Sequence, residues 1–186
     1  MQTDVTRRLF TADEFLRMGE AGIFEPEARL ELIEGEILEM SPIDPWHIAC
    51  VNRATELFVT KLSGRAIVSI QNPVRLSEYT EPQPDVALLK RRDDYYKEKR
   101  VSWEDAFLVI EVSDTSLSHD RNRKLPLYAK AGVSEIWIED LQSNSIDVYR
   151  NPGPKGYATS LTLHPGDPIS PMAFPDVVFK VEDLLG

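Results

Sequence analysis

The run Phe-Leu-Val-Ile-Glu-Val at residues 107–112 constrains the fold more than any other segment of the chain. It is apolar at nearly every position, which is typical of a strand that is covered on both faces at the centre of a mixed sheet. Glu111 breaks the pattern by placing a carboxylate in this strand. Burying an unpaired charge costs on the order of several kcal/mol. Glu111 is therefore expected to have a partner, to bind a metal, or to lie at the exposed end of the strand.

The totals limit the classes of protein to which the chain can belong. Its 186 residues suit one domain, and no apolar run is long enough to span a membrane. Residues 1–9 lack the apolar core of a signal peptide, so a soluble protein is expected. The single cysteine, Cys50, cannot form an internal disulfide, which favours a reducing compartment and a cytoplasmic location. Cys50 lies in an apolar helical pattern and is predicted to be a buried core residue rather than a nucleophile.

The net charge of −10 weighs against a protein that holds nucleic acid through nonspecific charge. It does not exclude a nuclease, because a divalent cation can offset a carboxylate-rich site and a local basic stretch can contact the backbone. Residues 90–100 form such a stretch, with Lys, Arg and two tyrosines. They are interpreted either as a solvated loop or short helix, or as a patch that meets phosphate or stacks on bases.

Local signals predict the first elements. A Thr-Ala-Asp-Glu capping box predicts a short helix over residues 12–18. Apolar runs on both sides of Gly35 predict a β-hairpin over residues 29–40, although their Leu and Glu content would also suit a helix. An Asp-Pro pair followed by apolar residues at helical spacing predicts the longest helix over residues 45–61.

The middle of the chain is predicted to hold three strands, at residues 66–70 with a continuation to residue 76, at residues 85–89 and at residues 107–112. Pro126 interrupts the helical pattern that follows, because it cannot donate a backbone hydrogen bond and it biases the preceding residue away from helix. A turn over residues 120–124 and then a helix from about Pro126 are expected, with Gly132 just past the end of that helix.

The last part of the chain is predicted to begin with a hairpin of residues 135–139 and 145–150. Residues 151–186 carry six of the thirteen prolines, and they are predicted to form an irregular wrap with short strands and a final turn at residues 181–185. One domain is therefore expected over residues 1–186, with its core in residues 1–150 and the wrap in residues 151–186.

Three charged residues around these strands suggest chemistry. Asp85 opens one predicted strand, Glu111 lies near the end of the next, and Lys124 follows on the connection to a helix. Two carboxylates on adjacent strands can hold one hard divalent cation, and a nearby ammonium can orient a water or offset charge on a phosphate. The alternative interpretation is an Asp in an ordinary turn and a Glu paired with an Arg. The spacing alone does not decide between the two.

A series of motifs runs in order from about residue 11 to residue 140. They are ELIEGE at 31–36, MSP at 40–42 with His47, QPDV at 83–86, LVIEVS at 108–113, then Ser116, Asp120 and Lys124, YAKAGV at 128–133 and EIWIED at 135–140. With this ordered set the chain resembles the Uma-type family of restriction-endonuclease-like proteins, a branch of the PD-(D/E)xK nuclease superfamily. The resemblance implies an α/β fold with a restriction-endonuclease-like core, a central mixed β-sheet flanked by helices.

The resemblance also implies roles for particular residues. Asp85 matches the Asp of the PD motif and Glu111 the acidic residue of the (D/E)xK motif, so both are expected to bind Mg²⁺ or Mn²⁺, together with the backbone carbonyl of Val112. Ser113 stands where the parent pattern has its lysine, and the resemblance points to Lys124 instead. Glu31 matches the upstream acidic residue, which binds metal directly or through water.

Other polar residues are assigned second-tier roles. Gln83 is expected to line the site. His47 matches a family histidine and either acts as a proton shuttle or phosphate contact, or else caps a helix turn or packs against Trp46. Asp120 is expected to pair with Arg121, Arg123 or Lys124, or to cap a turn, rather than to bind metal. His119 and His164 are expected to be surface residues.

Three functions remain open from the sequence. The first is a metal-dependent endonuclease that hydrolyses DNA phosphodiester bonds. The second is a catalytically weak or inactive nuclease-fold protein that binds nucleic acid or a protein partner, which the acidic charge and the lysine missing from the motif favour. The third is a metal-dependent hydrolase with another substrate. A homodimer is expected, because nucleases of the superfamily that the chain resembles often pair subunits to cut two strands, and because the hairpin at residues 135–150 would present a sheet edge.

Overall fold

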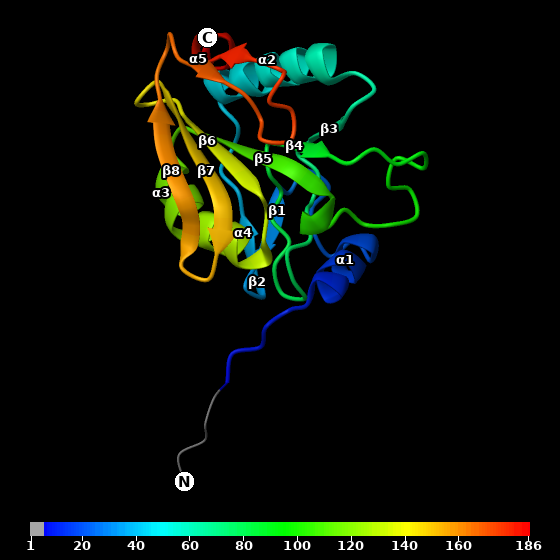
Figure 1. Cartoon of the computed structure of the whole chain (residues 1–186). Coiled ribbons are helices and arrows are strands. Elements are labelled where there is room, and N and C mark those ends of the chain that lie inside the picture. The colour runs from blue at the N-terminus through cyan, green and yellow to red at the C-terminus, as the bar shows by residue number, and fades with distance from the viewer. Residues whose placement is uncertain (1–5) are drawn as a thin grey trace.

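A six-stranded mixed sheet forms the centre of the computed structural model, which describes residues 6–186 (Figure 1). Its strands lie in the order β3–β4–β5–β6–β7–β8, with bounds Ile67–Ile70, Val86–Leu89, Ala106–Ser113, Glu135–Asp140, Ser145–Gly153 and Gly156–Leu163. The β5–β6 pair is parallel and the other four pairs are antiparallel. The predicted α/β class with a central mixed sheet flanked by helices is confirmed.

Helices cover both faces of this sheet. On one face lies α2 (Pro45–Leu62), with the short C-terminal helix α5 (Val181–Leu185) beside it (Figure 1). The buried side of α2 packs its apolar residues against the strands, and these residues are Cys50, Val51, Ala54, Phe58 and Leu62. On the other face lies a helical segment made of α3 (Leu117–His119), a π-helical turn η2 (Asp120–Lys124) and α4 (Leu125–Ala131).

The parallel pair β5–β6 determines where the polar residues meet. Two parallel neighbours need a crossover, because the chain must return to the end at which the first strand began. The helical segment of α3, η2 and α4 provides that crossover, so it starts at the end of β5. Since β4 runs antiparallel to β5, the start of β4 lies at the same edge of the sheet. The residue before β4, the end of β5 and the start of the crossover therefore come together.

The smaller elements surround this edge or complete the core. A hairpin of β1 (Leu30–Ile33) and β2 (Glu36–Glu39) turns at Gly35, whose φ of +80° suits glycine, so the predicted hairpin is confirmed over the competing helix. α1 (Ala12–Glu20) begins with the predicted capping box at Thr11. The remaining elements are the 3₁₀ turn η1 (Trp103–Asp105) and the pair β9 (Pro168–Ile169) and β10 (Phe179–Lys180).

Two local predictions were wrong in the middle of the chain. β3 ends at Ile70 and does not continue to residue 76, because Gln71 takes a left-handed conformation with φ +50°. Pro126 does not separate a turn from a helix: the segment from α3 to α4 is continuous, and the π-helical turn takes up the irregularity before the proline. Gly132 ends α4 with φ +102°, as predicted.

The prediction that the core ends at residue 150 was also wrong. β8 is an eight-residue strand that pairs with β7 from Ile146 to Gly153, so the sheet continues into the segment predicted to be an irregular wrap. The β6–β7 hairpin consequently lies inside the sheet and offers no free edge, which removes one of the two reasons for expecting a homodimer. The homodimer stays a prediction that light scattering can test.

The basic stretch at residues 90–100 forms turns rather than a helix. Its Arg92, Lys99 and Arg100 pair with Asp94, Asp105 and Glu81. Their charges are therefore largely satisfied within the protein. Among residues 6–186, no helix is both long enough and apolar enough to cross a membrane.

Cys50 is buried in the core, and its thiol donates to the backbone carbonyl of Leu185 at 3.2 Å. Burial raises the pKa of the Cys50 thiol to about 11, so the thiol stays protonated near neutral pH. The predicted core role of Cys50 is confirmed.

Candidate active site

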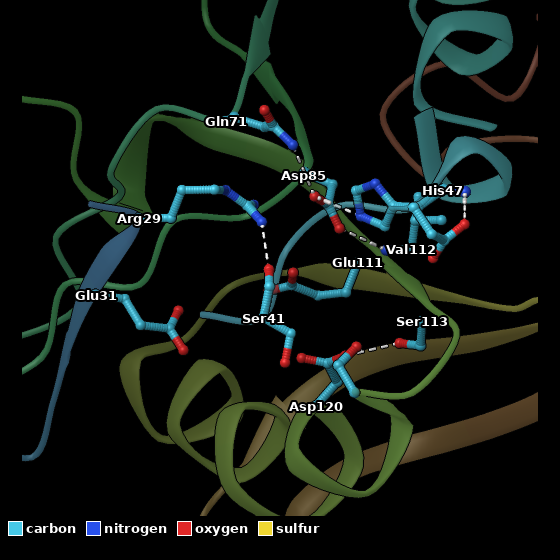
Figure 2. A network of polar contacts seen from close by, with 12 residues as sticks. Arg29, Glu31, Ser41, His47, Gln71, Asp85, Glu111, Val112, Ser113 and Asp120 are labelled. Atoms are coloured by element: carbon cyan, nitrogen blue, oxygen red, sulfur yellow. Dashed lines mark hydrogen bonds and ion pairs between the residues drawn. The ribbon is translucent and has the colours of Figure 1, made fainter. Parts of the chain in front are cut away.

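A pocket of about 490 Å³ opens at the edge of the sheet where β4 begins and β5 ends. Its walls come from the β1–β2 hairpin, the loop and helix start at residues 40–47, and the start of the crossover. The lining includes Glu31, His47, Gln83, Asp85, Glu111, Val112, Asp120 and Lys124, which are all the residues that the sequence placed in the site. Figure 2 shows the side chains of Glu31, Glu111 and Asp120 converging from three elements.

Asp85 is held by groups from three parts of the chain. His47 Nε2 lies 2.9 Å from Asp85 Oδ1, Gln71 Nε2 donates to the same oxygen at 3.3 Å, and the Val112 N–H donates to Oδ2 at 2.9 Å (Figure 2). Burial would raise the pKa of the Asp85 carboxyl, but hydrogen bonding to His47, the charge of His47 and the Val112 N–H outweigh it, so this pKa lies below its usual range. Asp85 is therefore an ionised carboxylate immediately before β4.

Glu111 is buried near the end of β5, and its pKa is shifted in the opposite direction to that of Asp85. Tyr128 of α4 donates to Glu111 Oε1 at 2.6 Å, and Lys124 Nζ lies 3.4 Å from both carboxylate oxygens. Burial, reinforced by the charges of Asp120 and Asp85, raises the pKa of Glu111 well above its usual value even though Lys124 lowers it. A cation near Glu111 would favour its ionised form.

Lys124 lies among three carboxylates. Its Nζ is 3.1 Å from Glu31 Oε2, 3.4 Å from Glu111 Oε1 and 3.5 Å from Asp120 Oδ1. Burial would lower the pKa of the Lys124 ammonium, but the charges of Glu111, Glu31 and Asp120 outweigh burial and raise it. Lys124 is therefore a permanently charged donor in the middle of an acidic pocket.

The π-helical turn places Asp120 and Lys124 in the pocket together. Asp120 Oδ2 accepts hydrogen bonds of 2.7 Å from both Ser113 and Ser116. Asp120 thus pairs with Lys124, one of its three predicted partners. Arg121 and Arg123 instead pair with other carboxylates, those of Asp140, Asp147 and Glu36. Ser113 thus helps to fix the Asp120 carboxylate that faces Lys124.

Two contacts in the pocket were not predicted. His119, expected to be a surface residue, lies with its Nε2 3.1 Å from Glu31 Oε1. Gln71 reaches Asp85, whereas Gln83 lines the pocket but donates its side-chain amide to the backbone carbonyl of Gln71. No local pattern marks either contact, because each depends on how distant elements pack. His164 is exposed, as expected.

His47 fits neither a cap nor packing against its neighbour. The cap of α2 is Asp44, and Trp46 points into solvent with 73% of its surface exposed. His47 turns its imidazole to Asp85 instead, and its Nδ1 is buried with no hydrogen-bond partner among residues 6–186.

The donor set fits a hard divalent cation. Asp85 and Glu111 offer two carboxylates at one edge of the sheet, and both belong to the lining of the same pocket. Within residues 6–186, no three His, Cys, Asp or Glu side chains form a complete metal cage. Mg²⁺ does not require one, because it is commonly held by one or two carboxylates and keeps several waters.

The comparisons with known proteins show a family and a similar fold. The family model Uma2, described as a putative restriction endonuclease, matches residues 12–182. Among solved structures, the fold is similar to that of a putative nuclease belonging to DUF820 from Anabaena variabilis ATCC 29413, with a TM-score of 0.72 and 17% sequence identity over 95% of this chain and 97% of that one. No curated protein is significantly similar in sequence.

Proposed function

We propose that this chain, which belongs to the Uma2 family of putative restriction endonucleases, is a Mg²⁺- or Mn²⁺-dependent endonuclease that hydrolyses DNA phosphodiester bonds. One observation carries the proposal: Asp85 immediately before β4, Glu111 of β5 and Lys124 of the crossover line one pocket. Lys124 contacts Glu111 directly, and Asp85 is bound by the N–H of the residue that follows Glu111.

Asp85, Glu111 and the backbone carbonyl of Val112 would hold the divalent ion. When bound, the ion supplies Lewis-acid polarisation of the phosphate. Asp85 is suited to bind the ion because it is ionised. His47, Gln71 and the Val112 N–H fix its orientation. Tyr128 fixes the orientation of Glu111 through the hydrogen bond from its hydroxyl to Glu111 Oε1.

Lys124 supplies the positive charge that the protein itself contributes. Because its pKa is raised, the ammonium keeps its proton and acts as a hydrogen-bond donor rather than as a base. It can orient the attacking water and offset charge on the phosphate as that charge develops. Glu31 and Asp120 hold the ammonium in place next to Glu111.

Cleavage of plasmid and single-stranded DNA, with Mg²⁺, with Mn²⁺ and with EDTA, tests the proposal. We expect metal-dependent cleavage that Asp85→Asn, Glu111→Gln and Lys124→Met each reduce about 100-fold or more. Glu56→Gln, an exposed change on α2 outside the pocket, is the control and should cut like the parent. Unchanged cleavage in both Asp85→Asn and Glu111→Gln would contradict the proposed endonuclease function of this pocket.

Calorimetry separates this function from a nuclease-fold binding protein. Both Asp85 oxygens already accept hydrogen bonds or contact His47, which is the observation that favours the binding protein. We expect Mg²⁺ binding that Asp85→Asn abolishes. Absence of binding at millimolar Mg²⁺, together with DNA binding but no cleavage, would favour the alternative.

A further inference from the structure

Arg29 stands apart from the other cations of the pocket. It lies just before β1, and its carbonyl accepts from the Met40 N–H at 2.8 Å, which extends the β1–β2 hairpin by one pair. Arg29 is two residues from Glu31, so the two side chains project from the same face of the hairpin. Both line the pocket. The fold therefore places a guanidinium beside the carboxylates that surround Lys124.

The pocket lining is strongly acidic, and its other cations are already paired. Seven Asp and Glu residues line it, against three Arg and Lys residues. Lys124 contacts three carboxylates, and Arg123 Nη2 lies 2.7 Å from Glu36 Oε2. Among residues 6–186, Arg29 is the only Arg or Lys side chain of the lining that makes no ion pair.

A backbone carbonyl positions the Arg29 guanidinium. Its Nη1 donates to the Ser41 carbonyl at 2.8 Å, and Figure 2 shows this bond from the hairpin to the loop before α2. A guanidinium has five N–H donors in a planar fork, so one such tether leaves donors free. This fork matches two oxygens of a phosphate, which a single ammonium cannot do. Arg29 is partly exposed, so a ligand that enters the pocket can reach it.

We infer that Arg29 is the phosphate-binding residue of this pocket, whose guanidinium donates to the non-bridging oxygens of a DNA phosphate. The inference rests on the proposed nuclease function and assigns the substrate contact within it. The acidic lining would repel a phosphodiester from this pocket, and a positioned cation that no carboxylate within residues 6–186 neutralises offsets this repulsion where the backbone enters.

DNA binding in the presence of Ca²⁺, chosen as the probe metal to separate binding from cleavage, tests the role of Arg29. Fluorescence anisotropy of a short labelled duplex is measured at several salt concentrations for the parent, Arg29→Gln and Arg53→Gln. Arg53 is the matched control: it also donates to a backbone carbonyl, that of Leu185 at 2.9 Å, makes no ion pair among the described residues and lies outside the pocket lining. Both changes remove the same charge.

We expect Arg29→Gln to weaken binding about tenfold and to lower the slope of log K against log salt by about 0.9, the effect of one lost phosphate contact. Arg53→Gln should match the parent. In cleavage assays with Mg²⁺, Arg29→Gln should raise KM with little change in kcat, and Arg29→Lys should recover part of the binding.

Two different results would overturn the inference. If the parent binds and cuts DNA and Arg29→Gln binds with the same affinity and salt slope, Arg29 does not contact phosphate and the nuclease function stands. If the parent neither binds nor cuts DNA while its fold is intact by circular dichroism, the nuclease function fails and the role of Arg29 fails with it.

Discussion

Glu139 on β6 is a buried carboxylic acid outside the pocket. It is completely buried, and neither carboxylate oxygen has a hydrogen-bond partner among residues 6–186. Burial, with a smaller contribution from the charge of Asp85, raises the pKa of Glu139 to about 8. The folded protein therefore keeps a proton on Glu139 at pH values where an unfolded chain has lost it.

This proton predicts the pH dependence of stability. Because the folded pKa is raised, the free energy of unfolding falls as pH rises from about 4.5, the ordinary value, through about 8. Glu139→Gln removes this titration. The free energy of unfolding of the variant, relative to that of the parent, should therefore rise by about a few kcal/mol between pH 5 and pH 8. Urea denaturation at both pH values measures it, with the exposed Glu56→Gln as the control. Parallel pH profiles for parent and Glu139→Gln would contradict the prediction.

The start of α2 shows how a helix cap serves the site. The Asp44 side chain accepts from the Trp46 N–H at 2.7 Å and from the His47 N–H at 3.0 Å. These bonds satisfy the first free N–H groups of the helix and fix the backbone from which His47 reaches Asp85. The cap thus links the stability of an element to the orientation of a proposed metal ligand.

Asp44→Ala should lower the free energy of unfolding by about 1 kcal/mol, the usual effect of losing a cap, and should also reduce cleavage because His47 is less well positioned. Denaturation and cleavage are measured on the same preparations. Thr11→Ala is the control: it removes the cap of α1, far from the pocket lining, and should lose similar stability without losing cleavage. Equal cleavage by the two variants would show that the cap of α2 has only a structural role.

The elements that the sequence predicted well are those with local signals. The capping box of α1, the Asp-Pro start of α2 and Gly132 each act within a few residues, so their patterns can be interpreted without the fold. β8 was missed because the prolines around it suggested irregular chain, while its partner β7 determines its conformation. The π-helical turn has no sequence signature of its own.

The residues of the site also differ in whether the sequence alone identifies them. Asp85, Glu111 and Lys124 were all assigned because their positions match a family motif, and the structure places the three in the lining of one pocket. The contact of His119 with Glu31 joins residues 88 positions apart and depends on the crossover packing against the hairpin. Arg29 belongs to none of the sequence motifs, and its lack of an ion pair with any residue from 6 to 186 can be seen only in the folded structure.

For the molecule as a whole, the site joins the hairpin, α2, the sheet and the crossover. A divalent ion that binds only the folded state should therefore stabilise the entire fold. At a concentration of about 100 times its Kd, Mg²⁺ should raise the free energy of unfolding by about 2.7 kcal/mol.

Thermal denaturation with Mg²⁺ and with EDTA measures this effect, and Asp85→Asn should abolish it. The same melting temperature for the parent under both conditions would contradict metal binding at this site. A shift of equal size in Asp85→Asn would place the ion elsewhere on the acidic surface.

The position of Lys124 among Glu31, Glu111 and Asp120 determines how the proposed metal site is held together when no ion is bound. The lysine is a resident counter-ion, so the acids are already held together before any ion arrives. Zinc-finger-type domains differ in that they gain their fold from the metal. In the proposed function, a divalent ion would enter a site that is already formed, and its supply would turn cleavage on and off while the polypeptide keeps one shape.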